Sequence, residues 1–203
     1  MQLQAVLPPE ARSPAEPAAE PRLTGDLAVW LVIAAELLTF GLLFVSYAFA
    51  RLREPELFAT LQATLDLDRG AFNTVLLISG SAAVAHAVAA LDAGRTAGAR
   101  RWLAAALACG ALFSVLKLDE LAAKVAAGAD LSANTFWMFY MVLSGFHLLH
   151  VVAAMVFLAV VWWLAGRGAY GPGRTHVPET AAAFWHMVDL LWIVLFPLLY
   201  VLR

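Results

Sequence analysis

The chain has little charge and almost no cysteine, and both shortages exclude classes of protein. Charged residues make up 14% of its 203 residues and the formal net charge is -2, so the composition indicates no nucleic-acid partner. A single cysteine, Cys109, can form neither an internal disulfide nor a zinc cluster. Hydrophobic residues make up 63% of the chain, and the mean hydropathy is +0.79. This is more apolar surface than a soluble core of this size buries, so the composition indicates an integral membrane protein.

Five apolar segments are each long enough to cross a bilayer. Spanning segments of about 20 residues must be helical, because lipid offers their backbone no hydrogen-bonding partner. The expected fold is therefore an all-α, polytopic five-helix transmembrane bundle over 24–203, preceded by a disordered tail over 1–23 that is rich in Pro, Ala and Glu. The predicted spans lie near 26–50, 70–91, 99–119, 134–164 and 178–202. The far end of the third span is the least defined, because Lys117, Asp119, Glu120 and Lys124 accumulate there.

An odd number of spans places the two ends of the chain on opposite sides of the membrane. Basic residues are nearly balanced between the two sides, so their number alone does not orient the bundle. Arg100 and Arg101 stand directly at a helix start on the side of the tail. They favour a cytoplasmic N-terminus and a periplasmic C-terminus, since basic residues near helix ends remain on the cytoplasmic side.

Ionisable side chains within the spans are the main functional signal. A central acidic or basic residue costs about 2.5–3.5 kcal/mol, so such groups usually face a partner, a cavity or a pathway. Counted from the tail-side end of each span, most of them fall in one half of the membrane. We therefore expect a buried polar cluster in which Glu36, His150 and His186 join the first, fourth and fifth spans. Its candidate members are Glu36, His86, His147, His150, Glu179, His186 and Asp189.

Each of these groups has a functional and a structural interpretation. Glu36 is either a proton-relay carboxylate or a hydrogen-bonded packing group that fixes helix register. His147 and His150, one turn apart, have the spacing of metal ligands, but no third ligand is evident, and interhelical hydrogen bonding is the better interpretation. His86 stands on a small-residue face that favours close helix packing. No catalytic residue, metal site or cofactor is predicted.

Four distinctive motifs follow one another along the chain. The most specific is Phe139–Val151, FYMVLSGFHLLHV, in which a glycine precedes two histidines one turn apart. The other three are Trp30–Glu36 with Phe40 and Phe44, Asn73–Gly80 with His86, and Glu179–Asp189 with Trp192. Together they cover about residues 24–202, and in this order they resemble the subunit III family of haem-copper oxidases. The longer members of this family have seven helices, and the first two, which form one wall of a lipid-filled cleft, have no counterpart here.

The resemblance implies a non-catalytic accessory subunit that binds the catalytic subunit of a membrane respiratory oxidoreductase and supports its assembly or stability. It implies a multi-pass protein of the bacterial inner membrane, with lipids as further partners and bound phospholipid as the one non-protein component left open. The length and the Leu57–Leu65 connection look most like the short branch associated with nitric oxide reductase, which would place the chain in denitrification. Subunit III of an oxygen-reducing cytochrome c oxidase is the first alternative. A stand-alone proton or solute carrier is the second.

Overall fold

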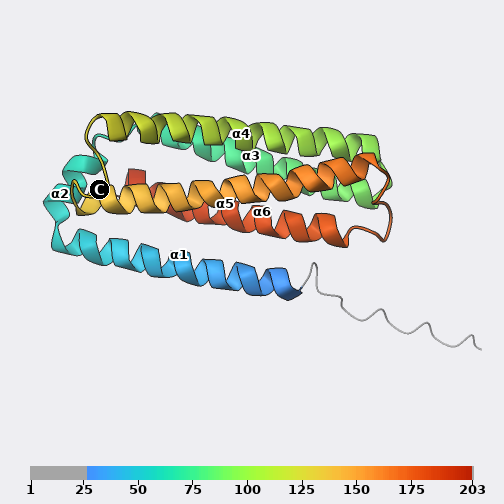
Figure 1. Ribbon diagram of the computed structural model, residues 1–203, viewed down its shortest axis with the longest axis horizontal. Coiled ribbons are helices and arrows are strands. Elements are labelled where there is room, and N and C mark those ends of the chain that lie inside the picture. The colour runs from blue at the N-terminus through green and yellow to red at the C-terminus, as the bar shows by residue number, and fades with distance from the viewer. Residues whose placement is uncertain (1–26, 203) are drawn as a thin grey trace, which may run out of the picture.

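The computed structural model describes residues 27–202, so the predicted tail over 1–23 lies outside the described residues. Within them the chain is helical almost throughout, and five helices are long and apolar enough to cross a membrane (Figure 1). The elements are α1 (Leu27–Arg53), α2 (Pro55–Gln62), α3 (Leu67–Asp92), α4 (Thr96–Ala126), α5 (Thr135–Gly166), α6 (His176–Phe196) and a π-helical turn, η1 (Pro197–Val201). The predicted all-α, five-span fold is confirmed.

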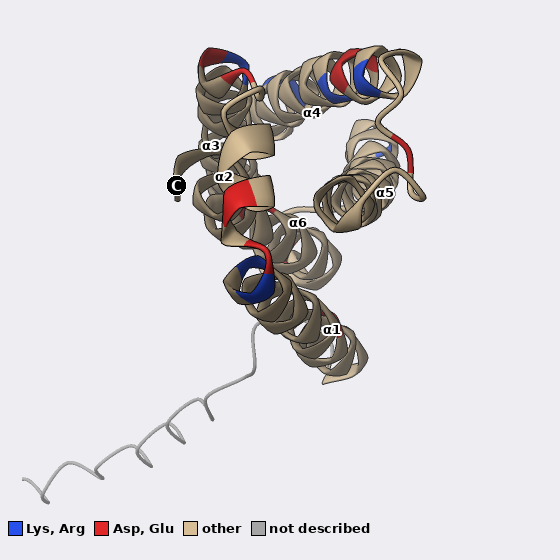
Figure 2. Cartoon of the chain, turned by 90° about the vertical axis from the view of Figure 1, so that its left-hand side faces the viewer, with Lys and Arg blue, Asp and Glu red and all other residues tan. Residues whose placement is uncertain are grey.

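The helices α3, α4, α5 and α6 pack around a common core, and α1 lies outside them against α6 and α5 (Figure 2). Only Ile33, Phe40 and Tyr47 of α1 are buried, whereas α5 and α6 bury residues along most of their length. The described chain begins at one end of the bundle and finishes at the other, as an odd number of spans requires (Figure 1).

Local sequence signals explain where the helices begin and end. The Asp66 side chain accepts a hydrogen bond from Arg69 N at the start of α3, and Asn134 accepts one from Trp137 N at the start of α5. Pro55 opens α2, a position that tolerates the missing N–H of proline. Gly94 follows α3 with a φ of 71°, a left-handed conformation that favours glycine.

The third span runs further than its charged residues indicated. The helix α4 continues to Ala126, because Lys117 and Glu120 turn inward and are buried among the other helices.

A buried glutamine side chain bonds to the C-terminal turn. Gln62 Nε2 donates to the carbonyl oxygens of Leu198 and Leu199, at 3.0 and 3.1 Å, and so satisfies acceptors at the end of the last span.

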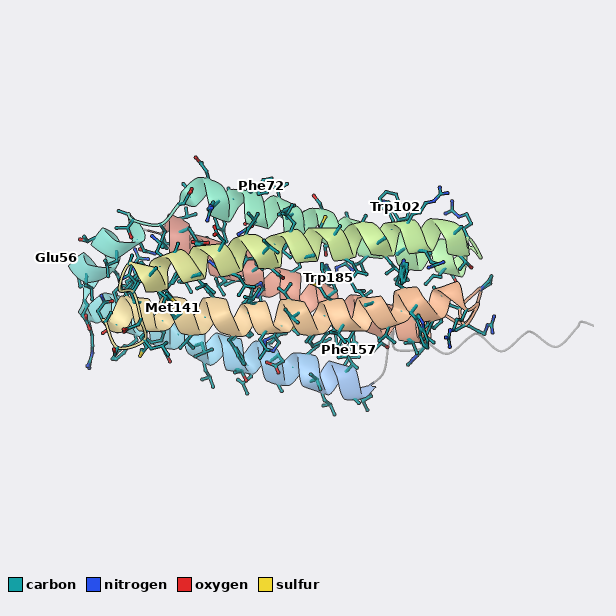
Figure 3. All side chains as sticks on the ribbon, turned by 45° about the horizontal axis from the view of Figure 1, so that its top comes forward. Glu56, Phe72, Trp102, Met141, Phe157 and Trp185 are labelled. Carbon is teal, nitrogen blue, oxygen red and sulfur yellow. The ribbon has the colours of Figure 1, made fainter. Side chains whose placement is uncertain are left out.

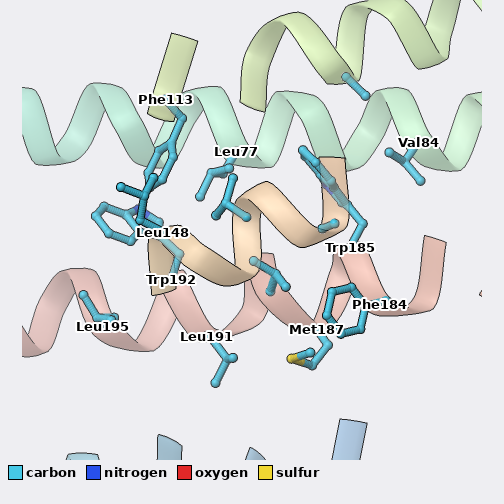
Figure 4. Packing of buried hydrophobic residues seen from close by; sticks show 14 of the residues in the cluster. Leu77, Val84, Phe113, Leu148, Phe184, Trp185, Met187, Leu191, Trp192 and Leu195 are labelled. Atoms are coloured by element: carbon cyan, nitrogen blue, oxygen red, sulfur yellow. The ribbon is translucent and has the colours of Figure 1, made fainter. Parts of the chain in front are cut away.

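Aromatic and aliphatic side chains together fill the centre of the four-helix core (Figure 4). The rings of Phe113 and Trp192 meet edge to face with centroids 4.9 Å apart. Trp185 is buried between the helices, while Phe72, Trp102 and Phe157 are exposed on the outer faces (Figure 3). A side chain at Gly110 would place its Cβ 2.9 Å from the Trp185 ring, so a glycine is needed there for α4 to approach α6.

Candidate functional site

Glu36 of α1 and His150 of α5 form an interhelical pair. His150 Nε2 lies 3.1 Å from Glu36 Oε2, and the side chains are 10% and 26% exposed. The two atoms are close enough for an ion pair, but the Glu36 oxygen makes no well-aligned hydrogen bond within residues 27–202. The Phe40 ring packs against the same imidazole with centroids 5.4 Å apart. The pair therefore joins the outlying helix α1 to the core.

The second nitrogen of His150 limits how protons are placed in this pair. Nδ1 lies 2.8 Å from the carbonyl oxygen of Phe146, which can only accept, so Nδ1 carries a proton. Nε2 is then the nitrogen that faces the Glu36 carboxyl group. Pairing of ionisable groups with one another is the usual arrangement at membrane depth.

An apolar cleft opens beside the Glu36–His150 pair. Its volume is about 500 Å³, and it lies between α1, α5 and α6. The lining includes Val32, Leu149 and Phe157, which are themselves exposed on the membrane-facing surface, so the cleft is reached from the lipid. The chemistry of this cleft suits an aliphatic chain, with a single polar pair at its wall.

His147 points into the core and makes no bond across helices. It is 0% exposed and lies between Phe113 and Trp192, with ring centroids 5.8 and 5.1 Å away. Neither ring nitrogen has a hydrogen-bond partner within residues 27–202. The prediction of interhelical hydrogen bonding is therefore wrong for His147, because aromatic rings, not polar groups, surround this imidazole.

His186 belongs to a different site from Glu36 and His150. Its Nδ1 lies 2.6 Å from Ser81 Oγ of α3, and the imidazole is exposed on the outer surface. Asp189, one turn further along α6, is 8% exposed and interacts with the same Ser81 side chain. The expected meeting of His186 with Glu36 and His150 is not found, since Ser81 and Asp189 hold this histidine at the α3 side of α6.

His86 and Glu179 also lie outside the expected cluster. His86 is exposed, and its ring stacks on Trp102 of α4 with centroids 4.9 Å apart. Glu179 stands in the first turn of α6 and accepts a hydrogen bond of 2.6 Å from Thr175 Oγ1. A carboxylate at that position is stabilised by the helix dipole. The prediction of one buried cluster of seven residues is thus corrected to several separate sites, because the residues share a depth but not a face.

A further polar site within residues 27–202 is completely buried and includes none of the predicted site residues. We call Lys117, Glu120, Tyr140 and Tyr200 the lysine cluster. Lys117 Nζ lies 3.2 Å from Glu120 Oε2 and 2.6 Å from Tyr200 Oη, and all four side chains are buried. The hydroxyls of Tyr140 and Tyr200 each donate to Glu120 Oε1 at 2.7 Å. The lysine cluster therefore binds α4, α5 and η1 together through bonds to charged groups, which are the strong ones.

A signal for the lysine cluster was present in the sequence. Lys117 and Glu120 are three residues apart on one helix face, a spacing that favours an ion pair. Asp119 and Lys124 stand on other faces, where Asp119 pairs with Arg69 at 2.9 Å and Lys124 donates to the carbonyl oxygen of Thr64. Four charges close together indicated a helix end, whereas two of them belong to the core.

The donor groups of these sites do not assemble into a metal centre. Among residues 27–202, no three His, Cys, Asp or Glu side chains come together in a set that could hold a metal ion. Nδ1 of His150 contacts the carbonyl oxygen of Phe146, and Nε2 contacts Glu36. These polar contacts instead hold helices to one another at membrane depth.

Fold and sites together define a small, polytopic, all-α membrane protein whose ionisable groups lie between or beside its spanning helices. The chain belongs to the cytochrome c oxidase subunit III family, whose model matches residues 24–202. Members of this family are in general non-catalytic subunits of oxidase complexes. The resemblance carried by the four sequence motifs is therefore confirmed at the level of the family.

Individual relatives agree with this assignment. A cytochrome c oxidase subunit 3 of Thermostichus vulcanus is 31% identical over 177 residues, 87% of this chain and 86% of that protein. A protein of the same name from Synechocystis is 32% identical over 86% of this chain and 74% of its own length. The subunit 3 of a cytochrome bo(3) ubiquinol oxidase from Pseudomonas putida is 27% identical over 87% of this chain and 84% of its own.

Proposed function

We propose that this chain is a non-catalytic accessory subunit of a respiratory haem-copper oxidase, which it stabilises by binding the catalytic subunit within the membrane. The observation that carries the proposal is the family match over residues 24–202, which spans all the described helices. The sites agree with it, because the Glu36–His150 pair and the lysine cluster both join helices to one another. We further propose that the chain lies in a bacterial inner membrane with its N-terminus cytoplasmic.

The narrower hypothesis of a nitric oxide reductase complex rests on the length of the chain, the Leu57–Leu65 connection and the Gly25-Asp26 start. Length does not separate the two complexes. The aligned 177 residues are nearly the same share of this chain and of the Thermostichus protein, so that cytochrome c oxidase subunit is about equally short. Oxygen is therefore the substrate we propose for the complex, and nitric oxide reduction is the second candidate.

The cleft beside Glu36 supports a role for lipid in this function. An acyl chain of a phospholipid would cover the Glu36–His150 pair and fill the space between α1 and the core, which few side chains of α1 occupy. The lining is aliphatic and aromatic, with Val29, Ala153 and Val160 among its residues. Bound phospholipid is the one non-protein component that we propose for this chain.

Purification of the tagged chain from its native membranes tests the proposal. We expect a haem-containing catalytic subunit to co-purify, and the isolated complex to reduce oxygen. Nitric oxide reduction without oxygen reduction would select the second candidate. A chain that is recovered without any haem protein, and that carries ion flux when reconstituted alone in liposomes, would contradict both and indicate a carrier.

A further inference from the structure

The outer face of α6 presents an imidazole at membrane depth. His186 is ten residues from the start of α6, about 15 Å along a span of 26 residues, so it lies well inside the span and not at its end. Nδ1 contacts Ser81 Oγ, and Nε2 has no partner among residues 27–202. An exposed histidine with a free nitrogen at this depth is rare, because lipid offers it no hydrogen bond.

Asp189 increases the polarity of the same face. It is 8% exposed, and its Oδ1 has no hydrogen-bond partner in the described part of the chain. The Ser81 side chain interacts with both this carboxyl group and the His186 imidazole. Three polar side chains from two helices thus form one set, the Ser81–His186–Asp189 set, whose imidazole is the exposed member.

The neighbouring surface of α3 is built for close contact. Four of its exposed positions near the Ser81–His186–Asp189 set are small, Ser79, Ala82, Ala85 and Ala89, although Ile78 and His86 are exposed among them. Small residues let another helix approach closely. The outer face of α5 differs, because it carries the large aliphatic side chains of Leu149, Val152, Val156 and Val160. The outer face of α6 is also aliphatic beyond His186, at Leu190, Ile193 and Val194. What distinguishes this surface from that of α5 is therefore the polar Ser81–His186–Asp189 set and the small residues of α3 beside it.

We propose that a transmembrane helix of the catalytic subunit packs on the outer face of α6 beside α3, with His186 as its hydrogen-bonding anchor. Ser81 and Asp189 position the imidazole, and a polar side chain of the partner helix bonds to Nε2. This inference rests on the proposed function, since it names the surface by which the accessory subunit is held.

A second copy of this chain fits the surface less well. A symmetric contact centred on His186 would face each group with its own copy. Imidazole would meet imidazole, and the Asp189 carboxyls would approach one another, so the contact would add no complementary charge. A different protein with a polar side chain at the matching depth meets the requirement.

Site-specific photo-crosslinking in the native complex tests the surface directly. A benzophenone side chain is placed at Leu190 on the outer face of α6, and at Val156 on α5 and Leu112 on α4 as matched controls, all of which are exposed. We expect a crosslink to the haem-bearing subunit from position 190 and not from the two controls. A crosslink from a control position alone, from position 190 to lipid only, or between two copies of this chain would overturn the proposal.

Substitution of the anchor gives a second, independent measurement. His186→Leu is expected to lower recovery of the chain with the catalytic subunit by about tenfold in a detergent-wash assay, the loss of one interhelical bond in a membrane. His176→Leu, at the exposed start of the same helix, is the control and is expected to leave recovery unchanged. Equal recovery of both variants would contradict the role of His186.

The two failures are distinguishable. If no haem protein accompanies the wild-type chain, the proposed function fails and the crosslinking has no partner to detect. If the haem protein co-purifies and the crosslinks come from α4 or α5, the function stands and only the surface is wrong. Thermal unfolding of His186→Leu, whose midpoint we expect to fall only by the loss of the Ser81 contact, separates loss of binding from loss of folding.

Discussion

The lysine cluster and the Glu36–His150 pair both hold ionisable groups at membrane depth, but they are bonded to different degrees. Lys117 is 0% exposed, and its carboxylate partner Glu120 accepts two further hydrogen bonds from tyrosines. Glu36 is 26% exposed at the wall of an apolar cleft, and among residues 27–202 its close polar partner is His150. The closed site fixes the core, whereas the open one attaches a helix that buries little else.

We infer that polar groups stabilise a membrane protein most where they are fully buried and bonded, and allow movement where they are partly exposed. A fully bonded pair cannot lose one member without leaving a charge in a low-dielectric interior. A pair that is partly exposed and borders a cleft can separate at lower cost, because lipid or another helix can cover it. We expect perturbations of the two sites to differ in size and in the part of the chain they affect.

Removing the carboxylate from the lysine cluster should have the largest effect. Glu120→Leu leaves the Lys117 ammonium buried with only hydroxyls beside it, and should lower the free energy of unfolding by about 3–5 kcal/mol. The measurement is a denaturant titration in detergent micelles, followed by circular dichroism. The control is Lys117→Met combined with Glu120→Leu, which removes both charges and should recover most of the loss. A double variant no more stable than Glu120→Leu would contradict the pairing.

The tyrosine hydroxyls allow a milder change to the same site. Tyr200→Phe removes a group that contacts both Lys117 and Glu120, and should cost about 1.5–3 kcal/mol, the range for hydrogen bonds to charged groups. Tyr170→Phe is the matched control, since its buried hydroxyl has no hydrogen-bond partner within residues 27–202. It should change the free energy of unfolding by less than about 0.5 kcal/mol. Similar losses for both variants would show that the hydroxyl contacts do not matter.

The open pair should respond less, and locally. Glu36→Leu should cost less than about 1.7 kcal/mol, the upper value for single interhelical hydrogen bonds in membranes, because the pair is in contact without good alignment. It should raise hydrogen exchange in α1 but not in α4. Glu36→Gln keeps a donor and an acceptor beside His150 and should retain most of the stability. If Glu36→Leu leaves α1 and assembly unchanged but removes the pH dependence of turnover in the complex, Glu36 is a proton relay and not a packing group.

Much of this fold could be predicted from sequence, because the length and polarity of spanning segments are set by the bilayer. The five spans follow from runs of about 20 apolar residues, and the ends from Pro55 and the glycines. The end of α4 could not be predicted in this way, because charged residues usually face water, whereas Lys117 and Glu120 are buried. The burial of Lys117 depends on Tyr140 and Tyr200, which are distant in sequence and are brought to it only by packing.

The polar sites were predicted in part for the same reason. Depth along a helix can be counted from the sequence, and it placed Glu36 and His150 at compatible heights. The direction in which a side chain faces depends on how the helices are rotated, and this is decided by contacts such as Ser81 with His186. Depth without rotation therefore gave a list of candidate residues but not their partners.

The smallest effect is expected at a carboxylate outside the membrane, which shows what burial adds to the two sites within it. In the α4–α5 loop the Ser132 hydroxyl and backbone N–H both donate to Asp130 Oδ1 at 2.8 Å, and these bonds hold the pKa of Asp130 below its ordinary value. Ser132→Ala should raise this pKa toward the ordinary value of an aspartate side chain, as measured by carbon NMR of the carboxyl group. Ser46→Ala, whose hydroxyl bonds to a carbonyl within α1, should leave it unchanged.

The sign of the accompanying pH effect follows from the lowered pKa of Asp130. The bonds from Ser132 favour the ionised carboxyl, so their stabilisation is complete above the pKa of the unfolded chain and is lost as the pH falls through that of the folded one. At neutral pH the loop should therefore show no pH dependence from this group. Because Asp130 is exposed to water, Ser132→Ala should change the unfolding midpoint far less than Glu120→Leu does. An equal change would mean that hydrogen bonding alone, without burial, accounts for the strength of the lysine cluster.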